Sequence, residues 1–400
     1  MEQTLTLPRR NALLMTALAY IPAVLAMMPV GVLVPFLETL KVDLATSGAQ
    51  LGLSIALFSI PAAVLATVGG GLIDQYGIRP SMLFAAAATA LGSVLASQVH
   101  SVLALDGAMV VGGVGFGALC VLAPCLVMAS LSEGRRTRAM AFVSTYAPTG
   151  YAAGLLLAVL FANAGEWRRA LLVHGTLMAA AFVLLALLLP PLQSATDLTQ
   201  EEPLRLRLAR LLRVFREPRV LRLAIAVALP NAVSYGTSLS APAYLARVNH
   251  LSIAVSSASV ASAKLAALIV GGVSVGLLLS RAIAPRVLYA VMVVVGLAAQ
   301  ATLYLVPGGL VVAILALMAW LFAFGGMTGG AMTLLPAVTA RGTGGGSASG
   351  LVNQFISLAS FATPSIWLSL HAGSQFVLLA GACLLVSLIA LPGIPARATP

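Results

Sequence analysis

The chain has 400 residues, of which 60% are hydrophobic and only 8% are charged, and its formal net charge is +11. Soluble domains carry about 25% charged residues, so this composition excludes a soluble enzyme, a disordered chain and a disulfide-stapled secreted domain. The basic residues lie in short segments between apolar runs, with few aromatic neighbours, which argues against nucleic-acid binding and fits the loops of a membrane protein.

Apolar runs of about twenty residues, the length needed to cross the hydrocarbon core, follow one another along the whole chain. Helices are the default spanning element because every backbone polar group has to be paired inside the membrane. The stretch after Arg9 and Arg10 is too long for a signal peptide and is expected to be a retained first span. We predict an all-α membrane protein with twelve transmembrane helices at about 12–37, 49–73, 81–99, 103–131, 139–162, 169–189, 221–246, 252–279, 287–306, 310–336, 347–370 and 375–391.

The basic residues are divided unevenly between the two sides of this arrangement. With the N-terminus inside, 17 of the 22 Lys and Arg residues fall on the cytoplasmic side and 4 outside, while Lys264 lies within a span. Because cytoplasmic loops collect Lys and Arg, we predict a multi-pass protein of the bacterial inner membrane with both termini in the cytoplasm.

The longest polar interruption divides the chain into two halves. We predict an N-terminal six-helix bundle (1–189), a basic cytoplasmic linker (190–220) and a pseudo-symmetric C-terminal six-helix bundle (221–400). Arginine recurs nearly every third residue over 205–222, which predicts either an interfacial helix on anionic lipid headgroups or a connector that serves only topology. In both halves the first span is interrupted by proline and the fourth is rich in glycine, a pattern that points to the transport site of repeat-built transporters.

One motif lies between the second and third predicted spans. Residues 70–79 resemble the signature of the major facilitator superfamily, G-x-L-x-D-[RK]-x-G-[RK]-[RK], at Gly70, Leu72, Asp74, Gly77 and Arg79. Two basic positions of the signature are not basic here. The second half carries a degenerate copy around Arg281, and residues 166–168 resemble the usual beginning of the family's sixth helix.

The resemblance implies alternating access by two rocking bundles, with a conformational latch at Gly70, Asp74, Gly77, Arg79 and Arg281. Gly70 would let helices approach closely. Asp74 would pair in one access state with an arginine or with the positive N-terminus of a neighbouring helix. The alternative is that Asp74 merely caps a helix.

The chain also departs from the drug/proton antiporters of this superfamily. Met109 stands where those proteins carry an arginine in the fourth span, and their fifth-span motif is only loosely suggested by Pro148, Gly150 and Gly154. Gly150 and Gly154 form a small-xxx-small pair, which is typical of helix packing.

Lys264 is the charged residue that the spans place near mid-membrane, with four serines on the turns before it and no acidic residue at the same depth. A lysine there costs roughly 2.5–3.5 kcal/mol on insertion scales and therefore faces a cavity or a partner. We predict that it binds an anionic group of a solute; a snorkelling or locally paired lysine is the alternative.

Other polar and aromatic groups in the spans are expected to face the interior. His174 could carry a proton, although a lone histidine more often serves packing. Together with Lys264, the predicted substrate-binding residues are Asn231, Tyr235, Tyr20, Asn353, Tyr146 and Trp320.

We predict a secondary active transporter that moves a small organic solute, and not an enzyme. We expect it to need no cofactor or metal and to be a monomer. An anionic or metal-chelating compound such as a siderophore-like metabolite is favoured, with protons as a possible coupling ion. Export is favoured because the chain lacks elaborated outer loops. The alternatives are an importer or exchanger of small carboxylates, or a drug/proton antiporter. A membrane-embedded enzyme would need intramembrane acidic or histidine clusters, and a receptor would need long extramembrane segments.

Overall fold

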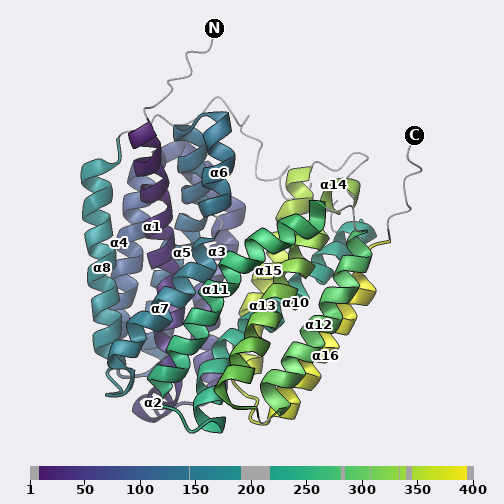
Figure 1. Cartoon of the computed structure of the whole chain (residues 1–400). Coiled ribbons are helices and arrows are strands. Elements are labelled where there is room, and N and C mark those ends of the chain that lie inside the picture. Colours follow the sequence, from purple (N-terminus) through teal and green to yellow (C-terminus); the bar gives the residue numbers. More distant parts are fainter. Residues whose placement is uncertain are drawn as a thin grey trace, which may run out of the picture. The chain divides into compact units, whose positions relative to one another are not determined.

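The computed structural model describes residues 9–143, 145–190, 217–280, 284–306, 308–332, 334–338 and 345–393. All regular elements in these ranges are helical (Figure 1). They are α1 (Arg9–Leu33), η1 (Val34–Phe36), α2 (Leu37–Asp43), α3 (Gly48–Tyr76), α4 (Ile78–Ser97), α5 (Val102–Ser130), α6 (Glu133–Val143), α7 (Tyr146–Ala162), α8 (Trp167–Leu188), α10 (Pro218–Val248), α11 (Ile253–Ser280), α12 (Pro285–Leu305), α13 (Gly309–Met332), α14 (Leu335–Val338), α15 (Gly345–Trp367) and α16 (Gly373–Ala390).

The predicted all-α fold is confirmed, and each of the twelve predicted spans coincides with helix, with the largest differences at the first and the fifth. Within the described residues, nine helices are long and apolar enough to cross a membrane, and Tyr146–Ala162 and Ile253–Ala267 are shorter apolar helices. The first span continues through the 3-10 turn η1 into α2, and α1 ends before Pro35, which has no N–H to continue its hydrogen-bond pattern. The fifth span, predicted as 139–162, is divided into α6 and α7. Helix α6 begins before the predicted span and includes Arg135, Arg136 and Arg138.

The chain divides into two compact units. The first comprises residues 1–201 with 242–262, and the second comprises residues 202–241 with 263–400. The predicted linker over 190–220 lies mostly outside the described residues, so the division into two six-helix bundles at this segment stays a prediction.

In the first unit, α1 is the central helix and packs on α7, α5 and α8. Glycines bring α1 and α7 into backbone contact, because a Cβ on Gly150 would overlap the carbonyl oxygen of Val24 and one on Gly154 would overlap that of Met28. The Cα of Gly31 would lie 3.0 Å from the Cβ of a residue at 154. The small-xxx-small pair predicted for helix packing therefore does pack a helix.

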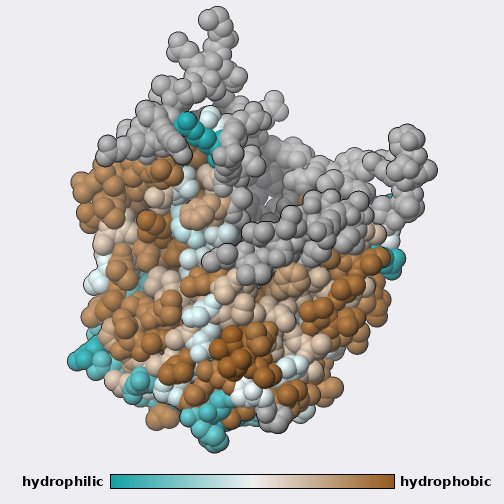
Figure 2. All heavy atoms as spheres, in the orientation of Figure 1, coloured by the Kyte–Doolittle hydropathy of each residue, from teal (hydrophilic) through white to brown (hydrophobic). Residues whose placement is uncertain are grey.

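Glycines also bring the glycine-rich α5 into backbone contact with α3 and with α4. A Cβ on Gly113 would overlap the carbonyl oxygen of Phe58 in α3, and one on Gly92 of α4 would overlap the backbone of Gly112. Outward-facing side chains of this unit are apolar, for example Leu177 and Leu187 of α8, which are 43% and 75% exposed. Hydrophobic residues cover much of the face shown in Figure 2, as a lipid-facing surface requires.

In the second unit, α12 packs on α13 and α16. Arg222, the last arginine of the basic run over 205–222, lies near the beginning of α10, which corresponds to the predicted span 221–246. Its guanidinium donates to the carbonyl oxygens of Ile389 at 3.0 Å and Ala390 at 3.1 Å. These carbonyls have no intrahelical partner at the end of α16, so Arg222 caps that helix and complements its dipole.

Candidate functional site

Hydroxyl groups of α1, of α7 and of the residue that precedes α7 form a cluster inside the first unit. The hydroxyl of Tyr20 lies 3.0 Å from Oγ1 of Thr145 and donates to Oγ1 of Thr149 at 2.9 Å. The Tyr20 ring lies against Phe142, with the ring centroids 4.3 Å apart. All three hydroxyl-bearing residues are half-buried, so the cluster offers hydrogen-bonding groups within otherwise apolar helices.

Tyr146 extends this polar region toward α5, because its hydroxyl donates to the Sγ of Cys120 at 3.0 Å. Tyr20 and Tyr146 were predicted as site residues, whereas Thr145, Thr149 and Cys120 were not. The i, i+4 spacing of the two threonines was a signal that they share one helix face. Nothing in the sequence indicated that this face meets Tyr20.

In the second unit, Asn231 and Tyr235 lie one turn apart on α10. Both are half-buried, whereas the residues between them and those from Gly236 to Pro242 are buried. The Asn231 side-chain amide donates to the carbonyl oxygen of Val227 at 2.8 Å. The two predicted site residues thus share one partly accessible polar side of α10.

The remaining predicted binding residues, Lys264, Trp320 and Asn353, belong to other helices of the chain. Lys264 is half-buried within α11, two turns after the buried Ser256 and Ser257. Trp320 has no exposed surface and packs against Gly296 and Phe324 in the second unit, so its assignment to a substrate site remains a prediction. Asn353 belongs to α15, but its side chain lies outside the described part of the chain.

The latch residues are only partly described. Gly77 connects α3 to α4 with φ 83° and ψ 161°, a conformation that is essentially restricted to glycine. The guanidinium of Arg79 donates to the carbonyl oxygen of Ala186 at 2.7 Å, near the end of α8. The surroundings of Gly70, the side chain of Asp74 and the whole of Arg281 lie outside the described residues, so the latch stays a prediction.

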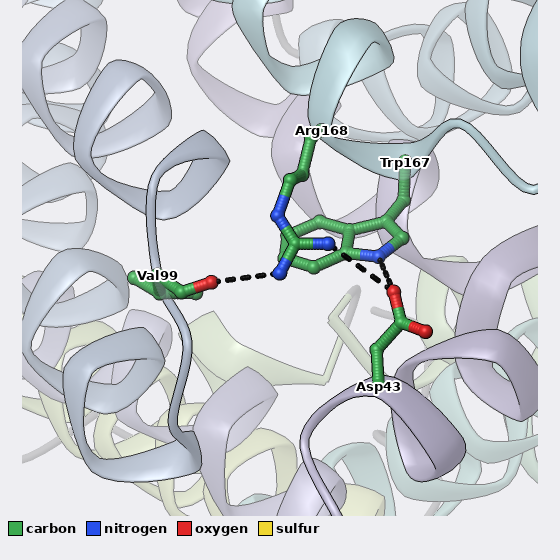
Figure 3. A network of polar contacts seen from close by, with 4 residues as sticks. All are labelled: Asp43, Val99, Trp167 and Arg168. Carbon is green, nitrogen blue, oxygen red and sulfur yellow. Dashed lines mark hydrogen bonds and ion pairs between the residues drawn. The ribbon is translucent and has the colours of Figure 1, made fainter.

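A polar network ties three helix ends together in the first unit (Figure 3). Asp43, at the end of α2, accepts a hydrogen bond from the Trp167 indole N–H at 2.8 Å. It also forms an ion pair with Arg168, with the charged atoms 3.2 Å apart. Arg168 also donates to the carbonyl oxygen of Val99, beyond α4, at 2.9 Å. Its guanidinium carbon stands 4.1 Å from the centroid of the Trp167 ring. The network fixes the beginning of α8 against α2 and the α4–α5 connection.

We expect Asp43→Ala to lower the melting temperature of the purified protein by several degrees. The substitution leaves the buried indole N–H of Trp167 and the guanidinium of Arg168 without their common acceptor. The expected cost is about 1–2 kcal/mol, because Asp43 and Arg168 are each about one-third exposed and solvent screens their ion pair. Glu38→Ala is the matched control, since the Glu38 side chain is 74% exposed in its pair with Lys41 and contributes almost nothing. Equal melting temperatures for the two variants would contradict the anchoring role of Asp43.

No group of three or more His, Cys, Asp or Glu side chains that could hold a metal ion occurs within the described ranges. The arrangement offers instead hydroxyls, an amide and one lysine set in apolar helices. Such groups can bind and release a polar solute.

Comparison with known proteins gives the following matches. The sequence profile described as Major Facilitator Superfamily matches residues 19–364. The cephamycin export protein CmcT of Amycolatopsis lactamdurans is 32% identical over 139 residues, and azole resistance protein 1 of Saccharomyces cerevisiae is 26% identical over 138 residues. Each match covers 34% of this chain, but only 29% and 22% of those proteins.

Among solved structures, the crystal structure of the nucleoside transporter NupG superposes with a TM-score of 0.76 at 15% identity. The superposition covers 95% of this chain and 98% of that one. At this identity the likeness establishes the fold and does not carry the nucleoside substrate to this chain.

Proposed function

Because the chain belongs to the major facilitator superfamily, whose members are transporters, we propose that it exports a small organic anion by alternating access. The observation that carries the anion assignment is the position of Lys264 within α11, where a cation favours a negatively charged group of the solute. Export is supported by the partial relatives, which are a cephamycin export protein and an azole resistance protein.

The hydroxyl cluster of the first unit is a second proposed solute contact. Tyr20, Thr145 and Thr149 can accept or donate hydrogen bonds to the polar groups of an organic compound. Met109, at the position where drug/proton antiporters carry an arginine, is 2% exposed and lines a small apolar cavity with Phe58. This departure favours an organic-anion exporter over a standard drug/proton antiporter.

The proposed setting is the bacterial inner membrane with both termini in the cytoplasm, supported by the 17-to-4 division of basic residues. We also propose the division into two bundles around 190–220, contact of the arginine-rich segment with anionic lipid headgroups, a monomeric state and coupling to protons. Arg222 takes no part in the proposed lipid contact, because it caps α16.

The test is protection of a bacterial host that lacks its own major drug exporters. We expect the protein to raise resistance to a cephamycin, which carries a carboxylate, at least about fourfold, and resistance to an uncharged azole much less. Lys264→Gln should abolish the protection against the cephamycin, whereas Lys264→Arg should retain part of it, because arginine keeps the charge with a different geometry.

Two results would contradict this proposal. Protection against the azole alone would favour a neutral substrate, and full cephamycin protection by Lys264→Gln would remove the anion assignment. Uptake of the labelled cephamycin into inside-out vesicles tests the direction, since an exporter fills such vesicles and an importer does not.

A further inference from the structure

A proline inside a transmembrane helix leaves one carbonyl oxygen without its backbone donor. Pro29 lies within α1, and the residue four positions earlier, Leu25, would otherwise bond to the N–H of residue 29. In a membrane, such an oxygen has to find another donor, because no water is at hand. The structure places a side chain from another helix at this oxygen.

His174 of α8 supplies the missing donor. Its Nε2 lies 2.8 Å from the carbonyl oxygen of Leu25, and its Nδ1 lies 2.8 Å from Oγ of Ser93 in α4. A carbonyl oxygen only accepts, so Nε2 carries the hydrogen and Nδ1 accepts from the serine hydroxyl. His174 has no exposed surface, and the contact therefore lies wholly within the packing of α1, α4 and α8.

The second unit repeats this arrangement with a different residue. Pro230 lies within α10 and frees the carbonyl oxygen of Ala226. Tyr289 of α12 donates to this oxygen at 2.6 Å, and its hydroxyl also lies 2.9 Å from Oγ of Ser387 in α16. Tyr289 and Ser387 are fully buried. In α1 and in α10, a side chain of another helix thus donates to the carbonyl oxygen that the proline leaves without a backbone donor. The donor is a histidine for α1 and a tyrosine for α10.

Space beside the first proline distinguishes this contact from ordinary packing. Pro29 and Ser93, the serine that contacts His174, are among the residues that line a small apolar cavity. A helix that lacks one hydrogen bond and borders unfilled space can bend there.

We infer that His174 and Tyr289 are positioning residues that replace the backbone donors lost at Pro29 and Pro230 and thereby fix the direction of α1 and α10. The direction of α1 sets the place of Tyr20, and that of α10 sets the place of Asn231 and Tyr235. This consequence for solute contact rests on the proposed function, whereas the replacement of the donor does not.

Paired substitutions test the replacement in the full-length protein purified in detergent. His174→Asn keeps an amide near Ser93 but withdraws the donor from Leu25, and should lower the melting temperature by about 1–4 °C. His174→Gln places its amide at the position of Nε2 and should lose much less. Pro29→Ala restores the backbone N–H, so in that background His174→Asn should cost little.

The same design applies to α10 and needs no transport assay. Tyr289→Phe removes only the hydroxyl, and its loss of thermal stability should shrink in a Pro230→Ala background. Equal losses with and without the proline, in either helix, would overturn the proposal for that helix. Equal losses for His174→Asn and His174→Gln would also overturn it for α1, because a purely space-filling role does not distinguish the two amides.

A second readout concerns positioning. With the labelled cephamycin as probe, His174→Asn should raise KM more than it lowers kcat, and Pro29→Ala should remove most of this effect. Failure of the cephamycin to be transported at all would reject the proposed substrate and leave the thermal measurements valid. Thermal coupling without any change of KM would confine His174 to stability and overturn its positioning role.

Discussion

Gly154→Leu is expected to abolish the accumulation of folded protein. A Cβ at this position would overlap the carbonyl oxygen of Met28 and lie 3.0 Å from the Cα of Gly31. Overpacking of side chains typically costs 1–3 kcal/mol, and we expect more here, since a backbone cannot escape by changing rotamer. Helix α1 is also held by α5 and α8, so α7 would have to separate from it.

The measurement is the fraction of monodisperse protein after size-exclusion chromatography in a mild detergent. Gly107→Leu is the matched control, because Gly107 also lies within a long helix, α5, but no neighbouring atom lies within 4 Å of its Cβ position. The control should accumulate like the wild type. A monodisperse Gly154→Leu protein with an unchanged melting temperature would show that the α1–α7 contact is not tight.

Asp74→Asn should leave folding nearly intact and slow transport by about tenfold, the effect of shifting a two-state equilibrium by roughly 1.4 kcal/mol. Asp74 lies in the last turn of α3, just before the glycine-specific turn at Gly77. The proposed latch requires its negative charge in one access state only, so neutralisation biases the equilibrium without removing packing.

Transport of the labelled cephamycin and the melting temperature should be measured together. The matched control is Asp106→Asn, since Asp106 accepts a hydrogen bond from Ser54 that an amide oxygen can also accept. It should transport at close to the wild-type rate. If Asp74→Asn transports normally, the latch proposal fails, and if its melting temperature falls steeply, Asp74 has a structural role instead.

The helical spans could be predicted because apolar length is a property of the local sequence. The partners across helices could not, since they depend on which faces meet after packing. Thr149 reads as an ordinary small residue until α7 brings it to Tyr20. In the sequence, Arg222 is one more arginine of a basic run, and only the folded structure shows that it binds the end of α16.

His174 illustrates the same limit. A lone histidine in an apolar span favoured a packing role in the sequence, and it is indeed fully buried. Its hydrogen bond to Leu25 could be anticipated only in part, since Pro29 showed that one carbonyl oxygen of α1 needed a donor. The sequence offered no means to decide which of the other helices would provide it.

The glycine contacts of the first unit also determine where motion can occur. A helix pair joined by long side chains can adjust when those side chains change rotamer. At Gly92, Gly113 and Gly154 a Cβ would overlap the backbone of the neighbouring helix, so these contacts contain no side chain whose rotamer could change. Bending is therefore expected at the few places where the helical hydrogen-bond pattern is already broken. A mutation that adds flexibility elsewhere in this unit should have little influence on the rate of the proposed transport cycle.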